Sequence, residues 1–125
     1  MYYRERVWQM IKKKITSKGF TIYEIDPLSH RMLQRVRLFG NECDGCNKEI
    51  EGVIYVPVLH YGFCEECFKE WYEEATYCDA DSEYEQERSK LLEKWLEYLY
   101  IDFETIKVEN MPLRDTERNK ENEQL

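Results

Sequence analysis

The stretch Cys43-Asp44-Gly45-Cys46 is followed, after seventeen residues, by Cys64-Glu65-Glu66-Cys67. Two Cys-x-x-Cys pairs at this separation are typical of one tetrahedral zinc site with four thiolate ligands. Two thiolates on one tight turn can both reach an ion about 2.3 Å away, and a hairpin between the pairs would bring the second pair back. The sequence therefore predicts one structural Zn(II) ion, with four ligands: Cys43, Cys46, Cys64 and Cys67.

The residues around the cysteines predict a knuckle, a β-hairpin and a helix over 41–77. Asn47 follows the first pair and tolerates the positive φ that such a knuckle needs. Gly45 relaxes the turn inside it. We expect short strands over 48–50, 53–56 and 58–59 around a turn at 51–52, with Pro57 on an edge or in a bulge. A helix with an acidic first turn is expected to begin at Cys64.

These two segments resemble the zinc sites of known proteins. Residues 43–52 are similar to the opening of a LIM zinc site, and 59–68 to its closing half. The chain thus resembles the treble-clef zinc fingers, and loosely the LIM proteins, over roughly 37 of 125 residues. It departs from the LIM pattern because His60 stands four positions before Cys64, one more than usual, and because a second ligand set is lacking. The resemblance implies a zinc ion, the local fold and a protein-binding role.

Two further residues could take part in metal or thiol chemistry. We expect His60 to lie outside the ligand set, packed beside the site or donating a hydrogen bond to it; the alternative is that His60 replaces Cys64 as a ligand. Cys78 is eleven residues past Cys67, too far along to join the site. We expect it to be a partly buried free thiol, with a reactive role as the alternative.

No catalytic pattern accompanies the cysteines. Four thiolates close the coordination shell, whereas a catalytic zinc keeps a position open for water or substrate. The sequence lacks a His-x-Glu ahead of the cysteines, a phosphate-binding glycine loop and a Gly-x-Ser-x-Gly. We therefore expect a protein that is not an enzyme.

The N-terminal 40 residues form a basic segment that we expect to pack on the core as helix and strand. Tyr3, Val7, Ile11 and Ile15 share one face of a predicted helix over 2–17, which Gly19 would end in a left-handed conformation. A cluster of lysines (Lys12, Lys13, Lys14, Lys18) either complements the dipole of that helix or binds phosphate.

The segment after Gly19 predicts a strand over 20–25, because it is rich in aromatic and β-branched residues. Asp26-Pro27 then favours the start of a helix to about residue 38, capped by Asp26. Residues 35–39 also alternate as a strand would, and the sequence leaves both interpretations of 27–39 open.

Residues 78–111 predict an acidic amphipathic helix and a short strand. Ser82 and Glu85 form a capping-box pattern at the start of a helix over about 83–100. Its apolar stripe comprises Tyr84, Arg88, Leu91, Leu92, Trp95, Leu96 and Leu99. A strand could follow over 101–108, and the charged residues 112–125 are expected to be disordered. The predicted fold class is α+β: a small zinc-stabilised treble-clef module between an N-terminal helix/strand segment and a long C-terminal helix.

The net charge of −8 is unevenly distributed. Residues 1–40 carry nine Lys/Arg and three Asp/Glu, and residues 41–125 carry nine and 23. The acidic part would repel nucleic acid, whereas tyrosine and tryptophan are favoured in protein interfaces. We therefore expect an adaptor, regulator or inhibitor that binds another protein, of the kind that phages and mobile elements encode. The alternative is a nucleic-acid-binding transcriptional regulator that uses the basic segment, which contains Lys12 to Lys14, Lys18, Arg31, Arg35 and Arg37.

The compartment is expected to be the cytoplasm. The sequence has no apolar run of about 18 residues and its start lacks the apolar core of a secretory signal. In a reducing compartment, paired cysteines indicate a metal site before disulfides.

Overall fold

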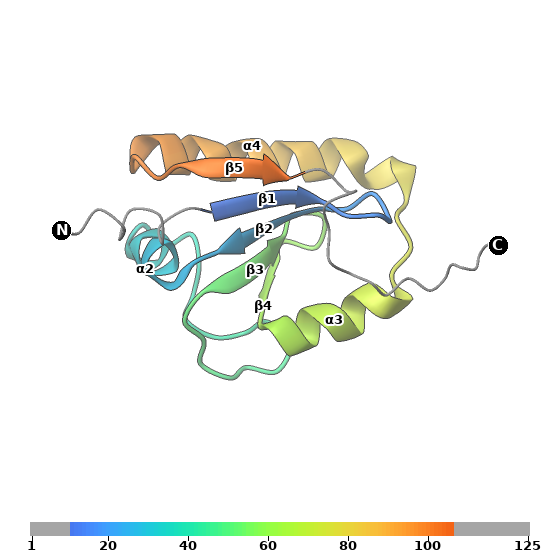
Figure 1. Cartoon of the computed structure of the whole chain (residues 1–125), viewed down its shortest axis with the longest axis horizontal. Coiled ribbons are helices and arrows are strands. Elements are labelled where there is room, and N and C mark those ends of the chain that lie inside the picture. Colours follow the sequence, from blue (N-terminus) through green and yellow to red (C-terminus); the bar gives the residue numbers. More distant parts are fainter. Residues whose placement is uncertain (1–10, 107–125) are drawn as a thin grey trace.

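A five-stranded sheet forms the centre of the molecule in the computed structural model, which describes residues 11–106 (Figure 1). Its strands are β1 (Ile11–Ile15), β2 (Thr21–Ile25), β3 (Val53–Val56), β4 (Tyr61–Phe63) and β5 (Phe103–Ile106). Their order is β4-β3-β2-β1-β5. All neighbours are antiparallel except β1 and β5, which are parallel. The fold is therefore mixed α+β, and its sheet joins strands from the N-terminal, cysteine-containing and C-terminal parts of the sequence.

Helices cover both faces of this sheet. They are α2 (Pro27–Arg35), α3 (Glu65–Glu74) and α4 (Ser82–Tyr98), with a short 3₁₀ turn, η1 (Asp79–Asp81). In Figure 1, α4 runs along β5 and partly behind it. Leu33 of α2 and Leu92 and Leu96 of α4 pack with Tyr23 and Tyr55 on one face. The opposite face holds a second core (Phe20, Ile22, Cys43, Val56, Phe63, Phe68 and Tyr72), which includes α3.

The helix predicted over 2–17 is wrong for the residues that the structure describes, because 11–15 form strand β1; residues 2–10 lie outside them. A spacing of four residues keeps Ile11 and Ile15 on one face of a strand as well as of a helix, so the pattern did not distinguish the two. Pairing with β2 and β5 on both sides decides the outcome. Gly19 has the expected positive φ of 99°, but in the turn between β1 and β2.

The next predicted elements are confirmed. The strand over 20–25 is β2, and the helix after Asp26 is α2, with Pro27 in its first position. The Asp26 carboxylate accepts a hydrogen bond from the Ser29 N–H at 3.1 Å. Helix α2 ends at Arg35, earlier than the predicted end at about residue 38. The strand interpretation of 35–39 is wrong, because residue 35 is still helical and Arg37 turns the chain with φ 65°.

The hairpin lies further along the chain than predicted. Its strands are β3 and β4, and 58–59 belong to the turn between them, in which the N–H groups of Leu59 and His60 both bond the Val56 carbonyl. Pro57 has no N–H with which to extend β3 and so begins this turn. Residues 48–50 form no strand; Glu49 makes a single bridge to Glu42.

Helix α4 corresponds to the helix expected over 83–100, but its beginning differs from the capping box. The structure gives Ser82 a place inside the helix, and the Glu85 carboxylate accepts hydrogen bonds from the Thr21 N–H (2.8 Å) and the Tyr77 hydroxyl (2.9 Å). Glu85 therefore ties α4 to β2 instead of capping its own helix. The expected strand over 101–108 is β5, whereas the predicted disordered tail lies outside the described residues.

On the side of α4 that faces β1, Tyr23, Lys13 and Glu93 form a polar cluster. The fully buried Tyr23 donates its hydroxyl hydrogen to Glu93, and Lys13 donates to the same carboxylate at 2.7 Å. Burial, and then Glu93, raise the pKa of Tyr23 far above its usual range, so this hydroxyl stays protonated.

Within 11–106 no helix is both long and apolar enough to cross a membrane.

Candidate metal centre

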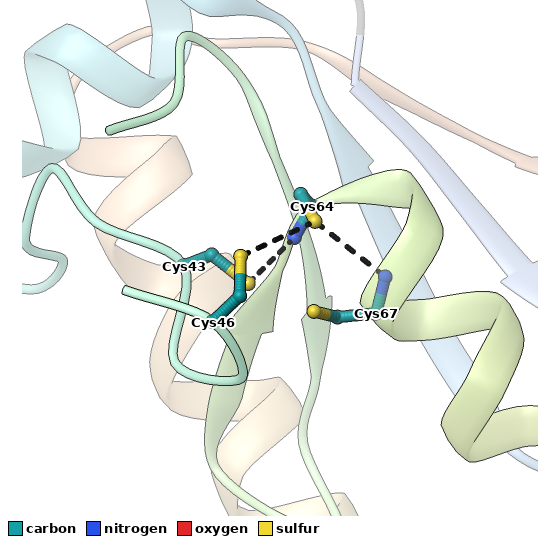
Figure 2. Close-up of side chains that lie close together, drawn as sticks. All are labelled: Cys43, Cys46, Cys64 and Cys67. Atoms are coloured by element: carbon teal, nitrogen blue, oxygen red, sulfur yellow. Dashed lines mark hydrogen bonds between the residues drawn. The ribbon is translucent and has the colours of Figure 1, made fainter. Parts of the chain in front are cut away.

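The four predicted ligands come together from three elements (Figure 2). Cys43 and Cys46 lie on the loop that joins α2 to β3, where Figure 2 shows them facing the other two cysteines. Cys64 follows β4 and caps α3, and Cys67 lies in the first turn of that helix. The hairpin between the two pairs thus returns the second pair to the first.

The sulfur atoms have the separation that a metal ion needs. All four lie within 4.8 Å of one another, and the Cys46 and Cys64 sulfurs are 4.0 Å apart. Zinc–sulfur bonds of about 2.3 Å in a tetrahedron put the sulfurs about 3.8 Å apart. The arrangement therefore fits a four-coordinate ion, and these four thiols are the only such group among the residues that the structure describes.

Backbone N–H groups point at the sulfur atoms. The N–H of Gly45 lies 3.3 Å and that of Cys64 3.2 Å from the Cys43 sulfur. The N–H of Cys67 lies 3.5 Å from the Cys64 sulfur, where that thiol acts as the helix cap. Such donors favour a charged thiolate over a neutral thiol.

The electrostatics of the group favour a bound cation. Burial opposes ionisation of Cys43, but the N–H groups of Cys64, Cys46 and Gly45 outweigh it and lower the pKa of this thiol to about 6. Burial, and then the hydrogen bonds with Cys43, Cys64 and Cys46, raise the pKa of Cys67 well above its usual range. One thiol therefore ionises readily while a neighbour resists. A divalent cation would stabilise all four as thiolates.

The loop around the first pair is fixed by hydrogen bonds. Asp44 is clamped to Gly62 in both directions: its N–H bonds the Gly62 carbonyl, and its carboxylate accepts the Gly62 N–H, both at 2.8 Å. Asn47 has the expected positive φ, 65°, and its N–H bonds the Cys43 carbonyl at 2.8 Å. Sequence analysis did not identify Asp44 as a residue that holds the cysteine loop. Its position between the two cysteines was the only signal in the sequence.

The positively charged side chain of Lys48 lies beside the thiols. The Lys48 ammonium is 3.7 Å from the Glu66 carboxylate. The charge of Cys64, and then that of Glu66, raise the pKa of this lysine. Lys48 therefore offsets part of the negative charge that four thiolates would place on this surface.

His60 and Cys78 lie outside the group. The His60 ring bonds the Tyr55 hydroxyl at 2.8 Å, and the four gathered thiols do not include it. Cys78 is exposed, so the prediction of a partly buried thiol is wrong. It begins the η1 turn, where its side chain is not drawn into either core.

The comparisons with known proteins give no family. No protein-family model, curated protein or solved structure matches this chain. The function must therefore be inferred from the geometry of the four cysteines and from the surfaces around them.

Proposed function

We propose that the protein is a non-enzymatic zinc-binding module that acts by binding another protein, as an adaptor, regulator or inhibitor. The observation that carries this proposal is the convergence of four thiols, which supply a complete tetrahedral ligand set. A closed shell of thiolates leaves no position for substrate or water. The ion would therefore stabilise the fold, and the binding activity would belong to the surface.

The packing around the site supports a structural ion. Cys43 is fully buried and belongs to the same core as Phe20, Ile22 and Phe68. An ion bound there would connect the 41–50 loop, the hairpin and α3, which is the arrangement of a treble-clef finger. Structural zinc contributes about 10–16 kcal/mol in small domains, as much as the net stability of a whole domain.

The exposed face of α3 supports a partner with a basic surface. Five glutamates lie on it, all exposed: Glu65, Glu66, Glu70, Glu73 and Glu74. Lys69 offsets only part of this charge, in a pair with Glu65 at 3.8 Å. A surface of one sign speeds association with a partner of the opposite sign.

The alternative, binding of nucleic acid through the basic segment, is less favoured because three of its four lysines already bond other parts of the fold. Lys13 pairs with Glu93, and the buried Lys14 pairs with Glu24 at 2.7 Å. Lys18 donates to the carbonyls that end α3, at 2.5 Å from Tyr72, 3.2 Å from Glu73 and 3.0 Å from Ala75. Phosphate binding by these three side chains would have to replace bonds that hold the structure together.

The test is affinity capture by the zinc-loaded full chain from a lysate of its source cells, with mass-spectrometric identification. The triple variant Glu70→Lys/Glu73→Lys/Glu74→Lys should lose the partner. The control is Glu97→Lys/Asp102→Lys, which reverses exposed acids away from α3 and should retain it. A gel-shift titration at two salt concentrations covers the alternative. Binding of nucleic acid that weakens steeply with salt, without capture of a protein, would contradict the proposal.

A further inference from the structure

Helix α4 has exposed apolar side chains in addition to those that it buries in the core. Leu92 and Leu96 are buried beneath it, together with Glu85 and Ser89. Tyr84 and Leu91, which the sequence places in the same stripe, are each 48% exposed, and Tyr98 is 72% exposed. These residues therefore form a second line on the helix, turned away from the buried one.

This second line has the spacing of a helix–helix seam. Its members follow one another at intervals of four, three, four and three residues: Tyr84, Arg88, Leu91, Trp95 and Tyr98, here termed the α4 stripe. Such a repeat keeps side chains on one side of a helix that packs against another helix at a shallow angle. From Tyr84 to Tyr98 the stripe extends for about 21 Å along α4.

The aromatic side chains of the α4 stripe are already ordered. The Arg88 guanidinium lies 3.6 Å from the centre of the Tyr84 ring and donates to the Pro57 carbonyl at 3.2 Å. Trp95 and Tyr98 meet edge to face, with ring centres 5.6 Å apart. Side chains that are fixed before association lose little conformational entropy when they dock.

The charges that flank the α4 stripe are self-complementary in one orientation only. Glu87 in the N-terminal half of α4 and Lys94 in the C-terminal half lie directly beside the stripe, whereas Glu83, Lys90 and Glu97 lie further round the helix; all five are exposed. Two parallel copies would place acids beside acids. Two antiparallel copies place Glu87 beside Lys94 of the partner subunit. They also place the positive end of each helix dipole beside the negative end of the other.

We propose that the protein forms a homodimer in which two α4 helices pack antiparallel through the α4 stripe. The contact would be isologous: each Leu91 lies near the two-fold axis and each Glu87 faces the lysine of the other copy. This interface uses none of the cysteines and none of the acidic face of α3. It therefore stands or fails independently of the zinc ion and of the protein partner.

The first test is sedimentation equilibrium of the zinc-loaded full chain over a concentration series. The expected species has twice the 15.4 kDa mass of one chain. Leu91→Glu should raise the dimer dissociation constant at least about tenfold, because two leucines lose their burial. Leu28→Glu is the matched control, since Leu28 is 39% exposed on α2, and it should leave the constant unchanged.

Charge reversal provides the second test and fixes the orientation. Glu87→Lys and Lys94→Glu should each weaken the dimer, and the double variant should restore it, because each single change places like charges opposite one another. Circular dichroism should show all of these variants folded. A wild-type monomer up to the solubility limit, a dimer that tolerates Leu91→Glu, or a double variant weaker than either single one would overturn the proposal.

Discussion

Gly45 lies against the side chain of Cys67. A Cβ atom at this position would be 2.9 Å from the Cys67 sulfur and 3.0 Å from the Cys67 Cβ. Gly45→Ala should therefore displace Cys67 and weaken zinc binding by about 1–3 kcal/mol, the usual cost of overpacking. Competition with a chromophoric chelator measures this change.

Gly40 provides the control for that substitution. A Cβ atom there would meet nothing within 4 Å, so Gly40→Ala should leave zinc affinity unchanged. Equal affinities for the two variants would show that the Cys67 sulfur does not lie against this turn.

His30 connects α2 to the segments that flank β3 and the cysteine loop. The fully enclosed ring accepts a hydrogen bond from the Gly52 N–H at 3.1 Å and lies 2.9 Å from the Gly40 carbonyl through its other nitrogen. This pattern satisfies both nitrogens only when the imidazole is neutral. Burial lowers the pKa of His30, although the Gly40 carbonyl opposes that shift.

The sign of the resulting pH dependence follows from the lowered pKa. The neutral ring contributes its full stabilisation above the unfolded value of about 6.5, and this contribution is lost as the pH falls through the lower folded value. The unfolding free energy of the wild type should therefore fall toward that of His30→Gln between about pH 7 and pH 5. NMR titration of the ring gives the pKa directly; a value at or above that of an ordinary histidine would refute the assignment.

At the scale of the elements, α4 is fastened to the sheet by a buried carboxylate. Glu85 is 5% exposed and accepts the Thr21 N–H and the Tyr77 hydroxyl hydrogen. Glu85→Ala leaves both donors without this partner and should lower the unfolding free energy by about 1–3 kcal/mol. Its exposed neighbour is the control: Gln86→Ala should change stability by no more than about 0.5 kcal/mol. Urea denaturation measures the stability of both variants, and equal midpoints would show that Glu85 does not hold α4 to the sheet.

The elements that sequence analysis predicted well are those with a local signal. The Asp26-Pro27 pair begins α2, the β-branched residues form β2, and the long periodic segment corresponds to α4. Strand β1 was missed because its four-residue apolar spacing suits a helix equally well, and only its pairing with β5, some ninety residues away in sequence, distinguishes the two. Glu85 was misassigned for the same reason, because its partners are distant in the chain.

At the scale of the whole molecule, the four thiols were predictable and their setting was not. The two Cys-x-x-Cys pairs identify the site because turn geometry and ligand spacing are local. The sheet around the site depends on contacts between distant parts of the chain. Strand β3 of the hairpin pairs with β2, which pairs with β1, and β1 pairs with β5. Cys43 packs with Phe20 and Ile22 in one core. The site is thus built onto the central sheet.

Zinc removal should therefore release one side of the molecule before the other. Cys64→Ser, or a strong chelator, should unfold the 43–77 region and loosen the core that contains Phe20 and Phe68. The opposite core contains no cysteine, and of its buried residues only Val53 and Tyr55 come from the 43–77 region, so the amides around Tyr23, Leu92 and Leu96 should stay protected longer. Hydrogen exchange followed by mass spectrometry resolves the two. Uniform loss of protection, or none, would contradict this order.

X-ray absorption spectroscopy of protein purified in the presence of zinc probes the ligands of the metal itself. We expect one zinc ion per chain with four sulfur neighbours at about 2.3 Å and no nitrogen or oxygen neighbour. A shell that contains a nitrogen or oxygen ligand would mean that the site is open or that His60 enters it. That result, or the absence of bound zinc, would contradict a closed structural centre formed by Cys43, Cys46, Cys64 and Cys67.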